Sequence, residues 1–291
     1  MPRRDALLGI TLVLPLLAVM LGLLAYPVGS ALLISLQDKT LGSPGTFIGV
    51  ANYVELFTED PRYFAVVRNS LVFTLVSVAG KLVLGMGMAL LLNQRIPGRQ
   101  LFRGWLLLPW IAPTFVTALT WRWMFDGTSG IINYVLQSAG IIEFPIAWLG
   151  LSGTALGAVI VTNVWRGFPF FGVSILAAMQ SLPEENFEAA SVDGASLWQK
   201  FRYITIPGIR TVLVIVTMLS TIWTFNDFAI VYIMTGGGPA FATQIFATYT
   251  YEIGFVGSRL GYAIAISTSL MPFLVILILA LSPLLMKGED E

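Results

Sequence analysis

The 291-residue sequence contains neither cysteine nor histidine. Without cysteine the chain can form no disulfide, no thiolate nucleophile and no cysteine-ligated metal site. Without histidine it lacks the commonest metal ligand and the side chain most often used for proton transfer near neutral pH. We therefore expect neither catalytic residues nor a metal site.

Charge is also scarce. Charged residues make up 11% of the chain and hydrophobic residues 56%, whereas about a quarter of a soluble domain is charged. The 16 basic and 16 acidic residues balance, so nothing suggests nucleic acid as a partner. This composition predicts an integral membrane protein. We treat residues 1–291 as one transmembrane domain, because little sequence remains for a soluble one.

Six apolar stretches are long enough to span a bilayer, which takes roughly 20 residues. They are Leu7–Leu36, Ser70–Leu92, Trp105–Met124, Thr154–Met179, Thr211–Met234 and Tyr262–Met286. The first is too long for the apolar region of a signal peptide. We expect it to be retained as a helix, kinked or tilted near Pro15 and Pro27.

The distribution of lysine and arginine predicts the orientation of these spans, because cytoplasmic loops carry an excess of both. One set of loops holds Arg3, Arg4, Arg95, Arg99, Arg103, Lys200, Arg202, Arg210 and Lys287. The other set is longer in total and holds Lys39, Arg62, Arg68, Arg122 and Arg259. We therefore expect the first set, with both termini, to be cytoplasmic.

A polar block at residues 183–207 separates the fourth and fifth expected spans. Pro183 followed by Glu184 and Glu185 is typical of a helix N-terminus. Gly194 would end this helix or permit close backbone approach. The block fits a helix on the bilayer surface. It also fits a helix that inserts a small-residue face into a cleft of another protein.

The block reads "EAASVDGASLWQKFRYITIP" from Glu188 to Pro207, and it resembles the EAA loop of bacterial ABC importer permeases. The matching residues are Glu188, Ala189, Ala190, Asp193, Gly194, Ala195, Phe201, Ile204 and Pro207. Ile206 stands where leucine is commoner. The stretches "LLLPWIAPTFVTALTWRWMFDGTSGIIN", "TGGGPAFAT" and "GVANYVELF" resemble the MalF-type carbohydrate permeases, so the resemblance covers nearly the whole chain.

This resemblance implies an all-α integral membrane protein with a type I ABC importer permease fold, six transmembrane helices and cytoplasmic termini. Its EAA loop would form a coupling helix that docks in a groove of an ATPase subunit. The coupling residues would be Glu188, Ala189, Ala190, Asp193, Gly194 and Pro207. The chain has no G-x-x-x-x-G-K-[ST] motif. The partner ATPase, and not this chain, would therefore bind ATP and Mg.

The resemblance also implies a set of partners. These are a second, MalG-like permease, a pair of ATPase subunits and an external solute-binding protein, all around a sugar substrate in a lipid bilayer. The binding protein would meet the outer loops, roughly Gln37–Asn69, Phe125–Gly153 and Thr235–Gly261. The location would be the plasma or inner membrane of a bacterium or archaeon.

A polar and aromatic group in the fifth expected span suggests a sugar site. Asp227 is the one acidic residue well inside a span, and Asn226 and Trp223 stand close to it. Carboxylates and amides hydrogen-bond sugar hydroxyls, while an aromatic face stacks on the apolar face of a sugar. A hydrogen bond between helices is the alternative role for Asp227. Ser220 and Thr224 share a helical face with Trp223 and Asp227 by their spacing.

In MalF-type permeases, sugar contacts come from the spans that here are three, four and five. Carried onto the matching motifs, these residues are Trp110, Thr114, Asn163, Gly167, Ser220, Trp223, Thr224 and Asp227. Gly167 would leave room for a sugar ring. Asp227 carries a charge where the family usually has an amide, and the two aromatic residues of the set, Trp110 and Trp223, are both tryptophan. The substrate class is therefore a disaccharide, an oligosaccharide or a related polyol or glycoside, with no single sugar named.

Two basic residues also lie within expected spans. We expect Lys81 to face protein or water, because a charge facing lipid costs at least ~2.5–3.5 kcal/mol. Its favoured role is to pair with a carboxylate of a neighbouring chain or span, and a part in translocation is the alternative. For Arg166 we favour snorkelling or pairing near the outer half of the bundle.

Two other functions, a secondary transporter and an intramembrane enzyme, fit the sequence less well. A stand-alone secondary transporter would need repeat symmetry and carboxylates that couple to an ion. The sequence shows no clear repeat and offers only Asp227. An intramembrane enzyme would need a nucleophile and a base, which a chain without histidine, cysteine, a G-x-S-x-G motif or an acidic pair in its spans does not supply.

Overall fold

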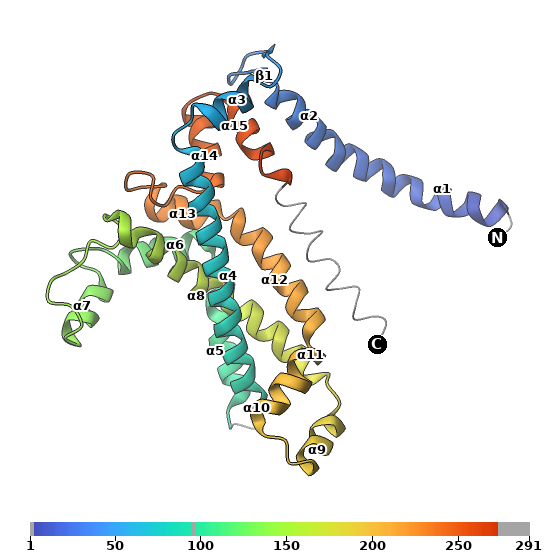
Figure 1. Ribbon diagram of the computed structural model, residues 1–291, viewed down its shortest axis with the longest axis vertical. Coiled ribbons are helices and arrows are strands. Elements are labelled where there is room, and N and C mark those ends of the chain that lie inside the picture. The colour runs from blue at the N-terminus through green and yellow to red at the C-terminus, as the bar shows by residue number, and fades with distance from the viewer. Residues whose placement is uncertain (1–2, 95–96, 273–291) are drawn as a thin grey trace. The chain divides into compact units, whose positions relative to one another are not determined.

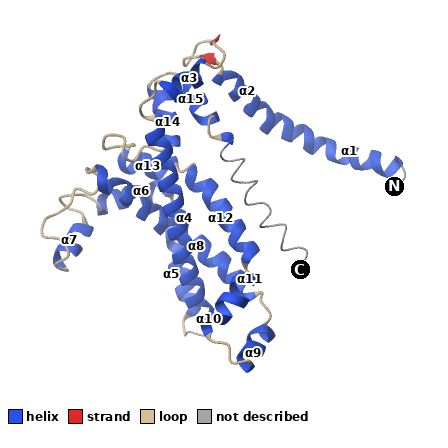
Figure 2. Cartoon of the chain, viewed as in Figure 1, coloured by secondary structure: helices blue, strands red, loops and turns tan. Residues whose placement is uncertain are grey.

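The computed structural model of the chain describes residues 3–94 and 97–272. The described chain is mostly helical, with one two-stranded sheet (Figures 1 and 2). It divides into two compact units. The first comprises residues 1–63 and 249–272, and the second comprises residues 64–248.

The first unit begins with a long helix. Its parts are α1 (Arg3–Met20), a π-helical turn (Leu21–Ala25) and α2 (Tyr26–Ser35). Pro15 lies inside α1 without ending it. The π-helical turn comes directly before Pro27, which has no N–H to donate to the preceding turn. The irregularity expected near the prolines is therefore a π-helical turn at the second of them.

The remaining elements of the first unit are short. They are β1 (Gln37–Asp38), β2 (Thr46–Phe47), α3 (Ala51–Thr58), the end of α14 (Phe246–Tyr251), a π-helical turn (Glu252–Val256) and α15 (Leu260–Thr268). The strands pair antiparallel, with Gln37 opposite Phe47 and Asp38 opposite Thr46.

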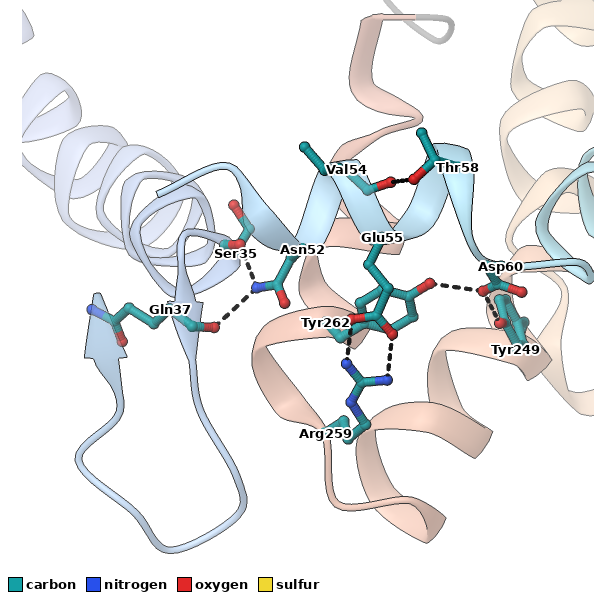
Figure 3. A network of polar contacts seen from close by, with 10 residues as sticks. All are labelled: Ser35, Gln37, Asn52, Val54, Glu55, Thr58, Asp60, Tyr249, Arg259 and Tyr262. Atoms are coloured by element: carbon teal, nitrogen blue, oxygen red, sulfur yellow. Dashed lines mark hydrogen bonds and ion pairs between the residues drawn. The ribbon is translucent and has the colours of Figure 1, made fainter. Parts of the chain in front are cut away.

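A polar network joins these elements (Figure 3). The Asn52 side chain donates to the carbonyls of Ser35 at 2.8 Å and Gln37 at 3.0 Å, which ties α3 to the end of α2 and to β1. Arg259 donates two hydrogen bonds to Glu55, at 2.7 and 2.6 Å.

The carboxylate of Asp60 is the second centre of this network. It accepts hydrogen bonds from the hydroxyls of Tyr249 and Tyr262, as Figure 3 shows. Arg62 pairs with Glu252 at 2.9 Å and lies over the ring of Tyr249. Residues that are about 190 positions apart in the sequence are thus held together by charge-assisted hydrogen bonds, which are stronger than neutral ones.

The second unit is a helical bundle. Its elements are α4 (Tyr63–Asn93), α5 (Arg99–Ile111), α6 (Thr114–Met124), α7 (Ile131–Ser138), α8 (Ser152–Gln180), α9 (Glu184–Val192), α10 (Leu197–Lys200), a π-helical turn (Phe201–Thr205), α11 (Ile206–Gly208), α12 (Arg210–Phe225) and α13 (Phe228–Thr235). The long helices α4 and α8 lie side by side, and Val164 and Phe171 of α8 come close to Gly80 and Gly85 of α4 (Figure 1).

Helix α8 contributes to two hydrophobic clusters. Val159 belongs to a cluster formed with α4, α6 and α13, and Phe171 and Ile175 belong to a cluster formed with α4 and α12. The stretch of α8 between these clusters contains the polar residues Thr162, Asn163 and Arg166 and the small residue Gly167 among apolar ones. Apolar packing therefore fixes both ends of α8 and leaves its middle for a site.

Several expected spans match the described helices and others do not. By length and apolar composition, Ile10–Ser35, Tyr63–Asn93 and Ser152–Gln180 can each cross a membrane. Two bent helix pairs raise the number of candidate spans in the described chain from three to at most five. Of the sixth expected span, only α15 and the few residues after it are described, and residues 273–286 lie outside the described part.

The third expected span is not one straight helix. Its two halves, α5 and α6, meet at an angle of 91°. The break lies at Ala112 and Pro113, where Ala112 is extended with a ψ of 133°. Proline disfavours a helical conformation in the residue before it, which explains the turn.

The expectation of a continuous helix over Thr211–Met234 is also wrong. Helix α12 ends at Phe225 and α13 begins at Phe228. Asp227 lies in the break, where its side chain accepts a hydrogen bond from the backbone N–H of Ile230 at 3.3 Å. A short polar side chain that satisfies the first N–H groups of a helix favours a new helix start.

Candidate functional site

A cavity of about 380 Å³ lies in the second unit, where the two helix breaks meet the polar stretch of α8. Trp110 reaches it from the end of α5 and Thr114 from the first residue of α6. Asn226 and Asp227 reach it from the break between α12 and α13. The breaks that interrupt two expected spans therefore shape one site.

All eight residues expected from the sequence to contact a substrate line this cavity. They are Trp110, Thr114, Asn163, Gly167, Ser220, Trp223, Thr224 and Asp227. Asp227 does so from outside the helix that carries Ser220, Trp223 and Thr224, so the single helical face expected for the four is wrong for Asp227. Tertiary folding, and not helical spacing, brings it to the same cavity.

Aromatic side chains form one wall. The ring of Phe170 lies 6.2 Å from that of Trp110, at an interplanar angle of 22°, and 5.2 Å from that of Trp223. Trp223 is 54% exposed, so much of its surface is free. Such a surface suits the apolar face of a sugar ring.

Asn163 and Asp227 form the polar part of the lining. They are joined by a hydrogen bond of 2.8 Å, which the Asn163 amide donates to the Asp227 carboxylate. Asn163 is buried, and its Oδ1 atom has no hydrogen-bond partner in the described chain. The α13 N-terminus also favours the negative charge of Asp227, because the helix dipole is positive there. This group can hold hydroxyls in fixed positions.

Lys81 and Arg166 line the same cavity. Lys81 is 5% exposed and donates a hydrogen bond of 2.8 Å to the Thr224 hydroxyl. Within the described residues it forms no ion pair with a carboxylate, and pairing with a neighbouring chain stays a prediction. Arg166 also lines the cavity, and the snorkelling or structural pairing favoured for it stays a prediction. The spacing of Arg166 with Asn163, Gly167 and Phe170 places all four residues on one face of α8. This spacing is the feature of the sequence that indicates that Arg166 lines the cavity.

Gly167 has a different structural role from the one expected. A Cβ atom at this position would lie 2.5 Å from the Cε atom of Lys81. That distance is far below a van der Waals contact, so the missing side chain makes room for Lys81. The expectation that this space admits a sugar ring is therefore corrected, although Gly167 still lines the cavity.

The lining combines an aromatic surface with hydroxyl, amide, carboxylate and cationic groups, which are groups able to bind a polar ligand. Across residues 3–94 and 97–272, acidic residues do not gather into a group able to hold a metal ion.

The second candidate site is the segment 183–207. Helix α9 begins at Glu184 directly after Pro183, as expected, and carries Glu184 and Glu185 in its first turn. Gly194 follows the helix with a φ of +75°, a conformation that residues with a side chain rarely adopt. Ser196 then caps α10 through a capping box with Gln199.

The segment presents a large exposed surface. Helices α9 and α10 contain no buried residue. Val192 is 88% exposed and Leu197 is 86% exposed, on either side of the turn at Gly194. Pro207 lies in α11, just before the 67° bend into α12. Exposed apolar side chains on a rigid helix–turn–helix are typical of a docking surface.

Comparison with known proteins identifies relatives over most of the chain. Residues 81–286 match the model of the family described as "Binding-protein-dependent transport system inner membrane component". The trehalose/maltose transport system permease protein MalF of Thermococcus litoralis is 36% identical over 91% of this chain and 90% of its own length. The sulfoquinovosyl glycerol transport system permease protein SmoG of Agrobacterium fabrum is 33% identical over 90% and 85%.

The fold is similar to that of a chain in the crystal structure of a bacterial ABC transporter that imports the acidic polysaccharide alginate. The TM-score is 0.81, and the match covers 98% of this chain and 96% of that one. At 21% sequence identity, this similarity concerns the fold alone.

Proposed function

Because this chain belongs to the family of binding-protein-dependent transport system inner membrane components, we propose that it is the permease subunit of an ATP-driven importer of a sugar. Family membership confirms the resemblance read from the EAA-like motif. It also disfavours a stand-alone secondary transporter. In this family the permease is a transport subunit, and ATP hydrolysis belongs to a separate subunit.

The cavity of the second unit is the proposed sugar site. The observation that carries this proposal is the convergence of an aromatic wall and a buried polar group in one cavity. Trp110, Phe170 and Trp223 would stack on the ring, while Asn163 and Asp227 would hold its hydroxyls. A di- or oligosaccharide, or a related polyol or glycoside, fits this chemistry.

The segment 183–207 is the proposed contact with the ATPase. Glu188, Ala189, Ala190, Asp193, Gly194 and Pro207 would form it. The exposed apolar side chains beside the Gly194 turn support this role, because a docked partner would bury them. A rigid segment that ends at the bend into α12 can pass motion of the ATPase to the helix that carries Trp223.

The proposed assembly contains a second, MalG-like permease, two ATPase subunits and an external binding protein that delivers the sugar to the outer loops. The chain would cross the plasma or inner membrane of a bacterium or archaeon with six spans and with both termini in the cytoplasm. Six spans are too few to enclose a sugar pathway alone. In this assembly the second permease would cover the cavity.

The test is uptake by the complete transporter reconstituted in vesicles. A thermal-shift screen of the cognate binding protein first names the sugar. Trp223→Ala should then lower uptake about two- to tenfold, because stacking is worth about 0.5–1.5 kcal/mol. Asp227→Ala should lower it about tenfold or more, because a charged hydrogen bond is worth about 1.5–3 kcal/mol. Assembly and binding-protein affinity should stay unchanged.

Trp123→Ala is the matched control, since Trp123 is an exposed tryptophan of α6 that does not line the cavity. It should transport at the wild-type rate. Wild-type uptake by both cavity variants would refute the site and leave Asp227 as a residue that only joins helices.

A further inference from the structure

The proposed sugar cavity contains more positive than negative charge. Its charged lining residues in the described chain are two cations, Lys81 and Arg166, and one carboxylate, Asp227. A neutral sugar would leave this excess unbalanced. In a membrane-spanning segment an unbalanced charge is costly, and it marks a functional site by default.

The hydrogen bonds do not remove the excess. Asp227 accepts from the Asn163 amide and the backbone N–H of Ile230, so neutral donors already hold it. Lys81 donates to the hydroxyl of Thr224, which carries no charge. Within the described residues, neither Lys81 nor Arg166 forms an ion pair.

Arg166 adds an independent observation. Its Nε atom is buried and has no hydrogen-bond partner in the described chain. A buried guanidinium N–H without an acceptor is destabilising, because it has lost its hydrogen bonds to water without replacement. A ligand oxygen that carried charge would satisfy this donor and balance the second cation at once.

The cations and the aromatic wall belong to the same cavity. Arg166 and Phe170 lie one turn apart on α8, and Phe170 touches both Trp110 and Trp223. A sugar ring stacked on this wall would thus lie beside a cationic region. A ligand with one apolar ring face and one anionic group would use both parts.

Resting on the proposed sugar function, we propose that the substrate is a monoanionic sugar, one whose carboxylate or sulfo group is held by Arg166 and Lys81. A single negative charge would make the cavity neutral, whereas the doubly charged phosphate of a sugar phosphate would reverse its charge. Asp227 would hold hydroxyls away from the anionic group, because two carboxylates repel each other at close range.

The test uses two matched probes and the purified complete transporter. Methyl glucuronide and methyl glucoside differ only in a carboxylate in place of a hydroxymethyl group, and the galacto-configured pair differs in the same way. Binding of each radiolabelled sugar is measured directly. Within at least one pair the uronide should bind at least about tenfold more tightly, as expected for a close charge pair. Binding of a methyl glucoside sulfated at C6 is measured in the same way, to show whether the site recognises a sulfo group as well as a carboxylate.

Arg166→Gln should reduce the uronide preference to less than about threefold while the affinity for the neutral glycoside stays the same. Arg166→Lys should restore part of the preference. Arg210→Gln, at an exposed arginine outside the cavity, should leave it unchanged. The wild-type comparison decides the proposal even if the Arg166 variants fail to assemble.

The outcomes separate the two proposals. If the neutral glycosides bind as tightly as the anionic ones, or more tightly, the preference for an anion is overturned and the sugar function stands. If no probe of either configuration binds and the thermal-shift screen of the binding protein yields no sugar, the sugar function is overturned, and this inference with it. If no probe binds but the screen names a neutral sugar, the preference for an anion is overturned and the sugar function stands.

Discussion

Gly167 of α8 leaves the space that Lys81 of α4 occupies. A Cβ atom on Gly167 would lie 2.5 Å from Cε and 3.1 Å from Nζ of Lys81. The two helices therefore meet at a position where any side chain larger than that of glycine would force the end of Lys81 to move. This relationship sets the place of the ammonium group in the cavity, where Lys81 also donates to Thr224.

Gly167→Ala should displace Lys81 and break its hydrogen bond to Thr224. We expect sugar uptake to fall at least about tenfold, because overpacking of a tight site costs about 1–3 kcal/mol. Gly157→Ala is the control, since the space around Gly157 on the same helix is open. Adding Lys81→Ala to Gly167→Ala should recover stability in thermal unfolding but not uptake. Normal uptake by Gly167→Ala would contradict this account of the lysine.

Gly194→Val should uncouple the transporter, because a β-branched residue does not adopt a φ of +75° and would move α10 relative to α9. Glu188→Lys should weaken binding of the ATPase by reversing a charge at the proposed contact. In each variant, ATPase activity should no longer be stimulated by loaded binding protein. Gly140→Val is the control, because Gly140 has a φ of +70° in open space outside this segment. Stimulated ATPase activity in both test variants would exclude the coupling role.

Cysteine labelling tests the expected orientation, and the absence of native cysteine makes single substitutions specific. Ser152→Cys, at the start of α8, should react with a membrane-impermeant maleimide in intact cells whose outer membrane, where one exists, has been permeabilised. Val192→Cys, at the end of α9 and 88% exposed, should react only after the cells are broken. The reverse pattern would invert the membrane orientation and remove the ATPase from reach of segment 183–207.

Asp60 should make the first unit more stable at neutral pH than at low pH. Burial opposes its ionisation. Hydrogen bonds from Tyr249, Tyr262 and the Arg62 backbone, together with the Arg62 charge, outweigh burial and lower the pKa of the Asp60 carboxyl. A carboxyl with a lowered folded-state pKa contributes stability above its unfolded pKa of about 3.9, and this contribution is lost as pH falls through the folded value.

Asp60→Asn should therefore unfold at a lower temperature than the wild type at pH 7, and the gap should close as pH falls below about 4. Glu59→Gln is the control at the neighbouring carboxylate, which neither tyrosine contacts in the described network. A gap that stays constant across this pH range would show that packing, and not the charge of Asp60, stabilises the unit.

The site residues could be found from the sequence only in part. Trp223 and Thr224 were found because an amphipathic pattern on one helix is a local property. Asp227 was found by its unusual charge, although its placement within that helix was wrong. Lys81 and Arg166 were seen as charges within apolar stretches, but their common cavity depends on three helices packing together.

The two helix breaks show the same limit. Apolar residues flank both Ala112–Pro113 and the polar pair Asn226–Asp227. Apolar content averaged over a window therefore predicts one span at each place. Pro113 was a visible signal for the first break. The second depends on Asp227 accepting from Ile230 and from Asn163, and the latter contact joins residues 64 positions apart.

Composition, a contiguous motif and a backbone position that needs glycine are local properties. The membrane class, the family and the helix–glycine–helix segment at 183–207 could therefore be predicted from the residues alone. The placement of Lys81 beside Gly167, and of two cations with one carboxylate in the cavity, follows from helix packing. Packing distances and charge balance arise between helices, where the order of residues along the chain sets no distance.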